Sequence, residues 1–289
     1  MIAEHGVSEG RFFKVVGRLE REAFLAAKRL RARRDGPQRF LLVSGVQRSG
    51  TNMIMDLLEA SPEADVYHET DPRAFENYMM RDEVTIARLV ERSRFPLFVL
   101  KALHEAERAR ALLDRFDPGR FIWVFRNWAD VVNSNMRSWP GGRNQIEDVV
   151  RDPSAARWRG RGMTPETHAM VRDAYRPGMN DASAQELFYV YRNQLLFDQA
   201  LERDPRTLVL DYDAFVANPG AGVRELAQFA GVAVTERMLA IPSAAVARRK
   251  SPPEVLPHIA GLAERMHARL REAALGATAS TGPKARAEP

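Results

Sequence analysis

Short apolar runs alternate with helical patterns along the middle of the chain. Runs rich in β-branched and aromatic residues predict the strands of a buried sheet at 39–46, 64–67, 97–101, 121–126 and 207–212. Between them, apolar residues recur at helical spacing, most strongly over 183–203 and 220–230. Strands that alternate with helices favour a parallel sheet. We therefore expect an α/β fold, a three-layer sandwich with a central parallel β-sheet.

The two ends and one internal segment differ from this body. Residues 11–34 have the pattern of a basic amphipathic helix whose apolar face includes Leu25 and Leu30, so 1–37 is expected to pack on the core as an N-terminal helix. The main domain is then 38–275. Within it, 140–180 is rich in glycine and arginine and predicts an irregular insertion with short helices, of the kind that forms a lid. The composition of 276–289 is typical of a disordered tail.

Composition excludes several classes of protein. The chain has 289 residues, a net charge of +5 and no cysteine, which rules out disulfides and cysteine-based metal or nucleophile sites. No apolar run approaches the roughly 18 residues that a membrane span needs, and the first twenty residues are too charged for a signal peptide. We expect no membrane span and a cytoplasmic location.

The sharpest motif is Gly45-Val46-Gln47-Arg48-Ser49-Gly50-Thr51-Asn52, at the end of the first predicted strand. Two glycines bracket four residues and an apolar helix follows, so backbone N–H groups and the positive end of the helix face one point. This context predicts a phosphate-binding loop. A nucleotide triphosphatase would have Lys directly before Thr51, whereas this chain has Gly50 there and its cation at Arg48. The loop therefore favours a phosphate-like group held without magnesium.

A second anion site is predicted where the strand at 121–126 ends. Arg126 closes the strand, and Ser134 lies eight residues further on, about two turns along the following helix. Arginine offers a rigid donor fork that suits phosphate, and serine adds a hydroxyl. Alone, this pattern is more typical of a capped helix with a surface arginine.

Together the two motifs resemble the sulfotransferase family, whose members use 3′-phosphoadenosine 5′-phosphosulfate (PAPS) and release adenosine 3′,5′-bisphosphate. The resemblance implies that Arg48, Ser49, Gly50, Thr51 and Asn52 bind the 5′-phosphosulfate and that Arg126 and Ser134 bind the 3′-phosphate. A third stretch, from Tyr212-Asp213-Ala214-Phe215 to Phe229-Ala230-Gly231, resembles a further family segment. The likeness runs from about Phe40 to Gly231 and is closest to the tyrosylprotein, carbohydrate and bacterial branches. The insertion has no match in it.

Three residues are candidates for the general base that an acceptor hydroxyl needs. Glu69, in Tyr67-His68-Glu69-Thr70, resembles the glutamate base of the tyrosylprotein and carbohydrate branches and is preferred. His104 follows Lys101 one residue later than the catalytic histidine of the cytosolic branch, and His68 is the third candidate. The resemblance implies that Lys101 steadies the leaving phosphate and that Arg48 shares the charge.

Other assignments are less specific. Arg249, Lys250 and Ser251 fall where the family often closes a basic loop over the nucleotide, but a solvated charge run explains them equally. Trp128 or Tyr212 could stack on adenine, although aromatic side chains more often pack in cores.

The leading interpretation is a metal-free, PAPS-dependent sulfotransferase acting by in-line transfer on a hydroxyl or amine. Its acceptor could be a small molecule, carbohydrate, lipid or peptide. The insertion's arginines fit an anionic acceptor, and solvated loop charges explain them as well. The alternatives are a P-loop nucleotide kinase or NTPase and a non-catalytic nucleotide-binding module; no nucleic-acid motif is found. The N-terminal helix would allow a homodimer.

Overall fold

A parallel sheet of five strands, in the order β2-β5-β1-β6-β7, forms the centre of the computed structural model, which describes residues 20–139, 141–242 and 251–280. The strands are β1 (Arg39–Gly45), β2 (Ala64–Tyr67), β5 (Leu97–Lys101), β6 (Gly119–Phe125) and β7 (Thr207–Asp211). Each lies at a run of apolar residues that predicted it. The α/β expectation is confirmed.

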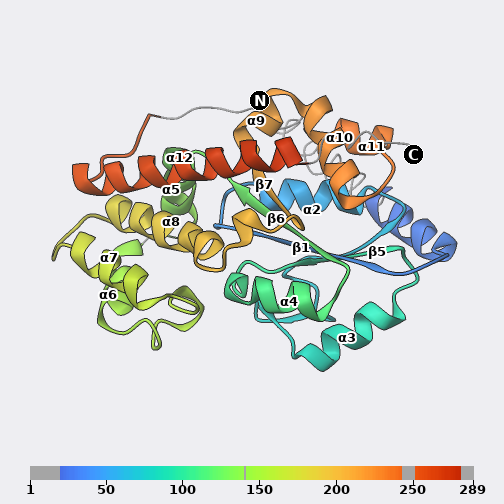
Figure 1. Ribbon diagram of the computed structural model, residues 1–289, viewed down its shortest axis with the longest axis horizontal. Helices are drawn as coiled ribbons and strands as arrows, with labels where there is room; N and C mark the ends of the chain where they lie inside the picture. Colours follow the sequence, from blue (N-terminus) through green and yellow to red (C-terminus); the bar gives the residue numbers. More distant parts are fainter. Residues whose placement is uncertain (1–19, 140, 243–250, 281–289) are drawn as a thin grey trace, which may run out of the picture.

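Helices cover both faces of the sheet, which makes the fold a three-layer sandwich (Figure 1). Alternate strand residues enter two cores, Leu42 with α4 (Ala109–Arg115), α8 (Asp181–Asp198) and α12 (Pro257–Ser280), and Leu41 with α2 (Thr51–Glu59) and α10 (Pro219–Ala230). Both faces of the strands are therefore buried, which is why their sequences read as continuous apolar runs.

The remaining elements connect or flank these layers. They are the hairpin β3 (Phe75–Glu76) and β4 (Met79–Met80), the helices α3 (Glu83–Arg92), α5 (Trp128–Ser138), α6 (Gly142–Arg151), α7 (Pro165–Ala174), α9 (Tyr212–Ala217) and α11 (Glu236–Ala240), and the 3₁₀ turns η1 (Ala106–Arg108), η2 (Arg157–Arg159) and η3 (Leu201–Arg203). The predicted insertion thus holds α6, η2 and α7, which pack against α8.

Two details at the ends of the chain differ from the prediction. The described part of the first helix, residues 20–31, packs on α2, where Nζ of Lys28 donates to the backbone oxygen of Glu59 at 2.7 Å. Leu30, which was expected on the buried face of this helix, is 83% exposed. The helix α12 continues to Ser280, so the tail predicted from 276 is helical at its start, where alanine-rich sequence has high helix propensity. The rest of that tail and of the first helix lies outside the described residues.

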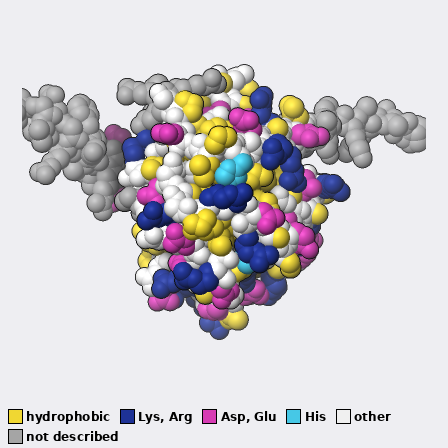
Figure 2. All heavy atoms as spheres, turned by 90° about the vertical axis from the view of Figure 1, so that its left-hand side faces the viewer, with side chains coloured by type: hydrophobic (Ala, Val, Ile, Leu, Met, Phe, Trp, Pro, Cys, Tyr) yellow, Lys and Arg dark blue, Asp and Glu magenta, His cyan; other side chains and the backbone are white. Residues whose placement is uncertain are grey.

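Charged side chains of both signs are interspersed with hydrophobic ones on the face drawn in Figure 2. On that face the described residues form no continuous basic surface of the kind that binds a polyanion. Within the described ranges, no helix has the length and hydropathy needed to cross a bilayer.

Strand register brings the candidate chemistry together. Val43 pairs with Lys101, Gly45 with Val124, and Phe125 with Asp211, so β1, β5, β6 and β7 all end at one edge of the sheet. We call this the carboxyl edge, because the strands are parallel and their carboxyl ends meet there.

Candidate active site

The turn between β1 and α2 needs its two glycines. A Cβ on Gly45 would lie 2.2 Å from the carbonyl oxygen of Val124, and a Cβ on Gly50 would lie 2.0 Å from the ring of Tyr212. Their φ angles are 147° and 98°, values that side chains disfavour. Because α2 begins directly at Thr51, the turn leads into the positive end of a helix. This strand, turn and helix form the context expected of a phosphate-binding loop.

Polar atoms buried in this turn lack protein partners. The Ser49 hydroxyl and both amide atoms of Gln47 make no hydrogen bond with any described residue. Leaving such a group buried and unpaired costs about 1–3 kcal/mol, so it marks a place where a polar ligand would restore the bonds. Between them, Arg48 adopts a φ of 71°, which is unusual for a residue with a side chain.

A cavity of about 270 Å³ lies in front of the turn, and we call it the basic cavity. Three cations from different strand ends line it: Arg48 after β1, Lys101 at the end of β5 and Arg126 after β6. Its other lining residues are Gln47, Gly50, Thr51, Asn52, Met53, Glu69, Leu103, Ser134, Trp139 and Tyr212. Three separate elements therefore direct positive charge at one small volume.

The contacts of Ser134 differ from the predicted arrangement. Its hydroxyl accepts a hydrogen bond at 2.8 Å from Nε of Arg48, which joins the two predicted anion sites. Arg126 instead pairs with Asp130 at 3.0 Å and approaches Asp213 at 3.7 Å, with its guanidinium 5.1 Å from the centre of the Tyr212 ring. Arg126 and Ser134 still line one cavity, but each is held by another partner, Arg126 by Asp130 and Ser134 by Arg48.

Lys101 is the most deeply buried of the three cations, with only 2% of its side chain exposed. Its ammonium donates to Oδ1 of Asn52 at 2.5 Å and lies 3.1 Å from Oε1 of Glu69. Burial lowers the pKa of Lys101 below its ordinary value, and the neighbouring Glu69 carboxylate opposes that shift. Asn52 and Glu69 thus hold the ammonium in place at the end of β5.

Glu69 lies at the junction of three cavities. It follows β2, lines the basic cavity, and also lines two further cavities that open on either side of it. A carboxylate at such a junction can contact a group in one cavity while it acts on a ligand in another. The other two candidate bases, His104 and His68, each line one of the two further cavities.

His104 lines the first of these further cavities, which holds about 320 Å³ and which we call the aromatic cavity. Most of its lining residues carry rings or carboxamides. The rings are those of Tyr78, His104, Trp139, Trp158 and Phe188, the carboxamides those of Gln47, Asn135, Gln145 and Gln185, and Glu69, Leu103 and Arg159 complete the lining. The His104 ring stacks on Trp158 at 4.2 Å, and its Nδ1 lies 3.2 Å from the backbone oxygen of Tyr78. Burial lowers the pKa of His104.

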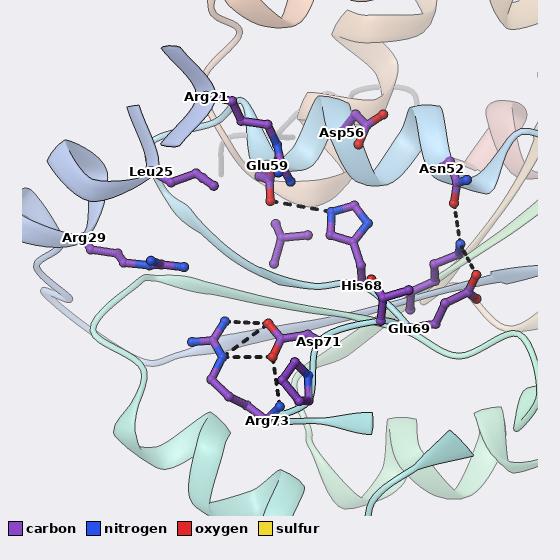
Figure 3. A pocket seen from close by; sticks show the side chains of 14 residues that line it. Arg21, Leu25, Arg29, Asn52, Asp56, Glu59, His68, Glu69, Asp71 and Arg73 are labelled. Carbon is purple, nitrogen blue, oxygen red and sulfur yellow. Dashed lines mark hydrogen bonds and ion pairs between the residues drawn. The ribbon is translucent and has the colours of Figure 1, made fainter. Parts of the chain in front are cut away.

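His68 lines the other cavity, a groove of about 870 Å³ between the first helix, α2 and the segment after β2, which we call the polar groove (Figure 3). Its Nε2 lies 3.6 Å from Glu59, which also pairs with Arg21. On the segment after β2, Asp71 pairs with Arg73, two residues further along. His68 does not line the basic cavity or the aromatic cavity, so it shares only the polar groove with Glu69, whereas His104 shares the aromatic cavity with it.

Some predicted residues lie elsewhere. Ser251 does not line the basic cavity; its backbone oxygen accepts a hydrogen bond from Asn133 at 3.0 Å. Arg249 and Lys250 lie outside the described residues. Trp128 lines a separate cavity beside Asp130 and Asp213, whereas Tyr212 lies against Gly50 in the basic cavity.

Other site residues had not been singled out from the sequence. Trp139 directly follows α5 and Trp158 lies in η2, and nothing in the local pattern distinguishes them from core aromatics. Asp213 accepts the Asn127 backbone N–H at 2.7 Å, and burial raises its pKa. Its place in the Tyr212-Asp213 motif was the available signal for its role beside Arg126.

Comparisons with known proteins identify the family and the fold. Residues 38–246 match the sulfotransferase domain family. The sulfotransferase domain of the Synechococcus PCC 7002 olefin synthase has a TM-score of 0.51 and 14% identity, over 81% of this chain and 96% of that one. A sulfotransferase from Alicyclobacillus acidocaldarius has a TM-score of 0.42 and 15% identity, over 85% and 96%. No curated protein matches the chain.

Proposed function

Because this chain belongs to the sulfotransferase domain family, we propose that it transfers a sulfuryl group from PAPS to an acceptor hydroxyl with Glu69 as the general base. The observation that carries this proposal is the convergence of Arg48, Lys101 and Arg126 on a cavity that Glu69 also lines. A donor with two separated anionic groups is the ligand that this charge distribution fits.

The residues present fit such a donor. The glycine turn, with the unpartnered Ser49 hydroxyl, would hold the 5′ phosphosulfate, and Arg48 lies beside it. Arg126 and Ser134 would hold the 3′-phosphate at the end of β6 and on α5. Because Arg126 is paired with Asp130 and Asp213, we expect it to exchange part of those contacts for the phosphate.

The chain's own groups divide the chemistry. When bound, PAPS would supply the sulfuryl group. The acceptor oxygen would form a new bond to sulfur while the bond between sulfur and the phosphate oxygen breaks, and the electron pair of that bond would stay on the phosphate oxygen. Glu69 takes the proton of the acceptor hydroxyl, since it lies between the basic cavity and the two cavities open to an acceptor. Lys101, fixed by Asn52, places a buried positive charge where negative charge develops on the leaving oxygen.

Ligand-dependent thermal stabilisation tests the proposal. Adenosine 3′,5′-bisphosphate, in the presence of a metal chelator, should raise the melting temperature, because binding to the native state stabilises it. Mg-ATP, added without the chelator, is the comparison ligand. Stabilisation by Mg-ATP and none by the bisphosphate would reject the proposal in favour of a nucleotide kinase or NTPase.

A further inference from the structure

The positive surplus of the chain equals the charge of one short segment. Residues 28–34, Lys28-Arg29-Leu30-Arg31-Ala32-Arg33-Arg34, contain five basic residues and no acidic one, and we call them the basic segment. Without these five, the chain would have 38 basic and 38 acidic residues, so its net charge would fall from +5 to zero. The basic segment precedes residues 38–246, which match the sulfotransferase domain family, and it does not line the basic cavity. The donor site therefore does not explain it.

Most of the basic segment is open to solvent. Among the described residues, Leu30 is the most exposed large apolar side chain, at 83%. The arginines around it are exposed as well: Arg29, Arg31, Arg33 and Arg34. Arg33 pairs with Asp35 at 3.0 Å, but both of these side chains are exposed, so water screens the ion pair. The arginines therefore keep most of their charge available to a partner.

The rest of the protein holds the basic segment in place at both ends. Lys28 is buried, and its ammonium donates to the backbone oxygen of Glu59 at 2.7 Å and lies 5.5 Å from the ring centre of Phe95. At the other end, the side chain of Gln38 accepts from Arg34 at 2.7 Å and donates to the backbone oxygen of Phe95 at 3.3 Å. A surface that is ordered before a partner arrives lowers the entropic cost of binding.

The end of α3 and the residues after it extend this positive surface. Arg92 and Arg94 are exposed and come just before Phe95, which Lys28 and Gln38 both contact. The exposed acidic residues next to these arginines in the sequence are Asp35 and Glu91. We call Leu30 and the six arginines the basic surface: Arg29, Arg31, Arg33, Arg34, Arg92 and Arg94. On the face drawn in Figure 2, by contrast, charges of both signs are interspersed.

The charge and the apolar side chain together indicate the kind of partner. Clustered arginines bind polyanions, of which an anionic bilayer and a nucleic acid are the common examples. A nucleic acid would leave Leu30 exposed to water. A bilayer would bury Leu30 at the level of the head groups, while the arginines reach the lipid phosphates with their guanidinium groups. The basic surface therefore fits an anionic bilayer better than a nucleic acid.

We propose that the basic surface docks the protein on a bilayer that contains anionic phospholipids. Leu30 enters the head-group layer, and the arginines contact the phosphates around it. This docking goes beyond the sulfuryl transfer proposed above and does not require it. Arg29 also lines the polar groove, which reaches Glu69 (Figure 3), so the docked bilayer lies beside a cavity of the candidate active site.

Co-sedimentation with lipid vesicles tests this proposal. Vesicles of phosphatidylcholine with about 30% phosphatidylglycerol are compared with vesicles of phosphatidylcholine alone, at about 0.1 M salt. The protein should bind the anionic vesicles at least about tenfold more tightly, because each basic side chain near an anionic bilayer strengthens binding about fivefold. Added salt should weaken the binding, because it screens exposed charges.

Two variants locate the binding on the basic surface. The triple variant Arg31→Gln, Arg33→Gln, Arg34→Gln should weaken binding to anionic vesicles about a hundredfold, because three of the cations are lost. Leu30→Gln should weaken it about fivefold, because less apolar surface enters the head-group layer. Both variants should keep the melting temperature of the wild type, since the substituted side chains are exposed.

The matched control removes the same charge from another part of the surface. The triple variant Arg143→Gln, Arg151→Gln, Arg172→Gln substitutes three exposed arginines of the insertion and should weaken vesicle binding less than about threefold. Equal losses in the two triple variants would overturn the proposal, because net charge alone would then explain the binding.

Other outcomes would also overturn the proposal. One is the absence of a preference for anionic vesicles. Another is binding to a DNA duplex, lost in the triple variant of the basic segment, without binding to vesicles, which would assign the basic surface to a nucleic acid. None of these measurements depends on adenosine 3′,5′-bisphosphate. Failure of the docking proposal would therefore leave the proposed function standing, and failure of the bisphosphate to bind would leave the docking proposal standing.

Discussion

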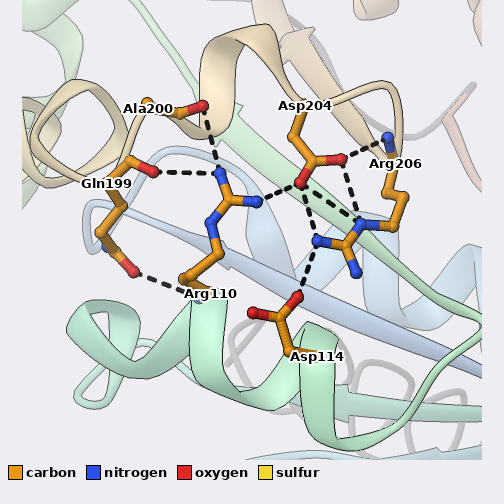
Figure 4. A network of polar contacts seen from close by, with 6 residues as sticks. All are labelled: Arg110, Asp114, Gln199, Ala200, Asp204 and Arg206. Carbon is orange, nitrogen blue, oxygen red and sulfur yellow. Dashed lines mark hydrogen bonds and ion pairs between the residues drawn. The ribbon is translucent and has the colours of Figure 1, made fainter.

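The two edges of the sheet use the same residue types in opposite ways. We call the opposite edge, where the amino ends of the parallel strands meet, the amino edge. There Arg110 of α4 and Arg206, which precedes β7, both pair with Asp204, and Arg206 also pairs with Asp114 at 2.9 Å (Figure 4). At the carboxyl edge, Arg48, Lys101 and Arg126 line a cavity.

The difference lies in whether the cations share a cavity. Nη2 of Arg110 also donates to the backbone oxygens of Gln199 and Ala200, at 3.1 and 3.2 Å, so this arginine makes most of its hydrogen bonds within the network. The carboxyl edge leaves Ser49 and Gln47 buried without partners. The charges of the Arg110–Asp204–Arg206 network are therefore directed at one another. The three cations of the carboxyl edge share a cavity with unpartnered polar atoms, as a ligand site would, although Lys101 and Arg126 also pair with carboxylates.

Glu69→Gln gives the largest expected effect. Turnover should fall about a thousandfold, because the amide cannot accept the hydroxyl proton, while affinity for adenosine 3′,5′-bisphosphate stays within a few fold. Steady-state rates and calorimetry measure the two quantities. His68→Asn is the matched control and should retain nearly full turnover; equal losses in both variants would remove the distinction between Glu69 and its neighbours. Full activity in Glu69→Gln would transfer the role of base to His104 or His68.

Lys101→Met should lower kcat about a hundredfold, because a fixed cation near the leaving oxygen is removed. The free energy of unfolding should also fall, by about 1–3 kcal/mol, because the Asn52 carbonyl oxygen and the Glu69 carboxylate lose their shared donor. Steady-state rates measure kcat, and denaturant titration measures the free energy of unfolding. A variant that loses stability but keeps its kcat would make Lys101 a structural residue, like those of the amino edge.

Asp204→Asn should lose stability without losing activity. The free energy of unfolding should fall by about 2 kcal/mol, because Arg110 and Arg206 lose their shared carboxylate, while kcat and donor affinity stay unchanged. Denaturant unfolding measures the loss. A change in kcat without a change in stability would contradict the assignment of the two edges.

Acid titration sharpens the same contrast with a smaller effect. The hydrogen bonds from Arg206, followed by those from Arg110, hold the pKa of Asp204 at about 2, below its unfolded value of 3.8. A lowered carboxyl pKa stabilises the native state above pH 4, and that contribution, up to about 2 kcal/mol, is lost as pH falls from 4 to 2. The difference in stability between wild type and Asp204→Asn should therefore shrink over this range, and a constant difference would contradict the account.

Much of the carboxyl edge could be predicted, because its residues sit at fixed points of regular elements. Lys101 and Arg126 each end or follow an apolar run, and parallel strands bring such ends together. Glu69 comes shortly after the short parallel strand β2, so it is expected at the same edge. The sequence pattern thus predicted which cations share the edge.

The walls of the aromatic cavity could not be predicted. Trp158 belongs to a 3₁₀ turn in the insertion, and its place against His104 depends on Arg192 of α8, a contact between segments with no shared periodicity. The bond between Arg48 and Ser134 likewise depends on side-chain conformation, and it appears only once β1 and α5 are placed together.

Calorimetry of two ligands against two proteins tests the central claim most directly. Wild type and Arg126→Ala are each titrated with adenosine 3′,5′-bisphosphate and adenosine 5′-monophosphate, with chelator present. The account predicts that the wild type binds the bisphosphate at least tenfold more tightly and that Arg126→Ala abolishes this preference, because a charge-assisted bond of about 1.5–3 kcal/mol is lost. An undiminished preference in Arg126→Ala would show that the carboxyl edge does not bind the 3′-phosphate through Arg126, and would contradict the account.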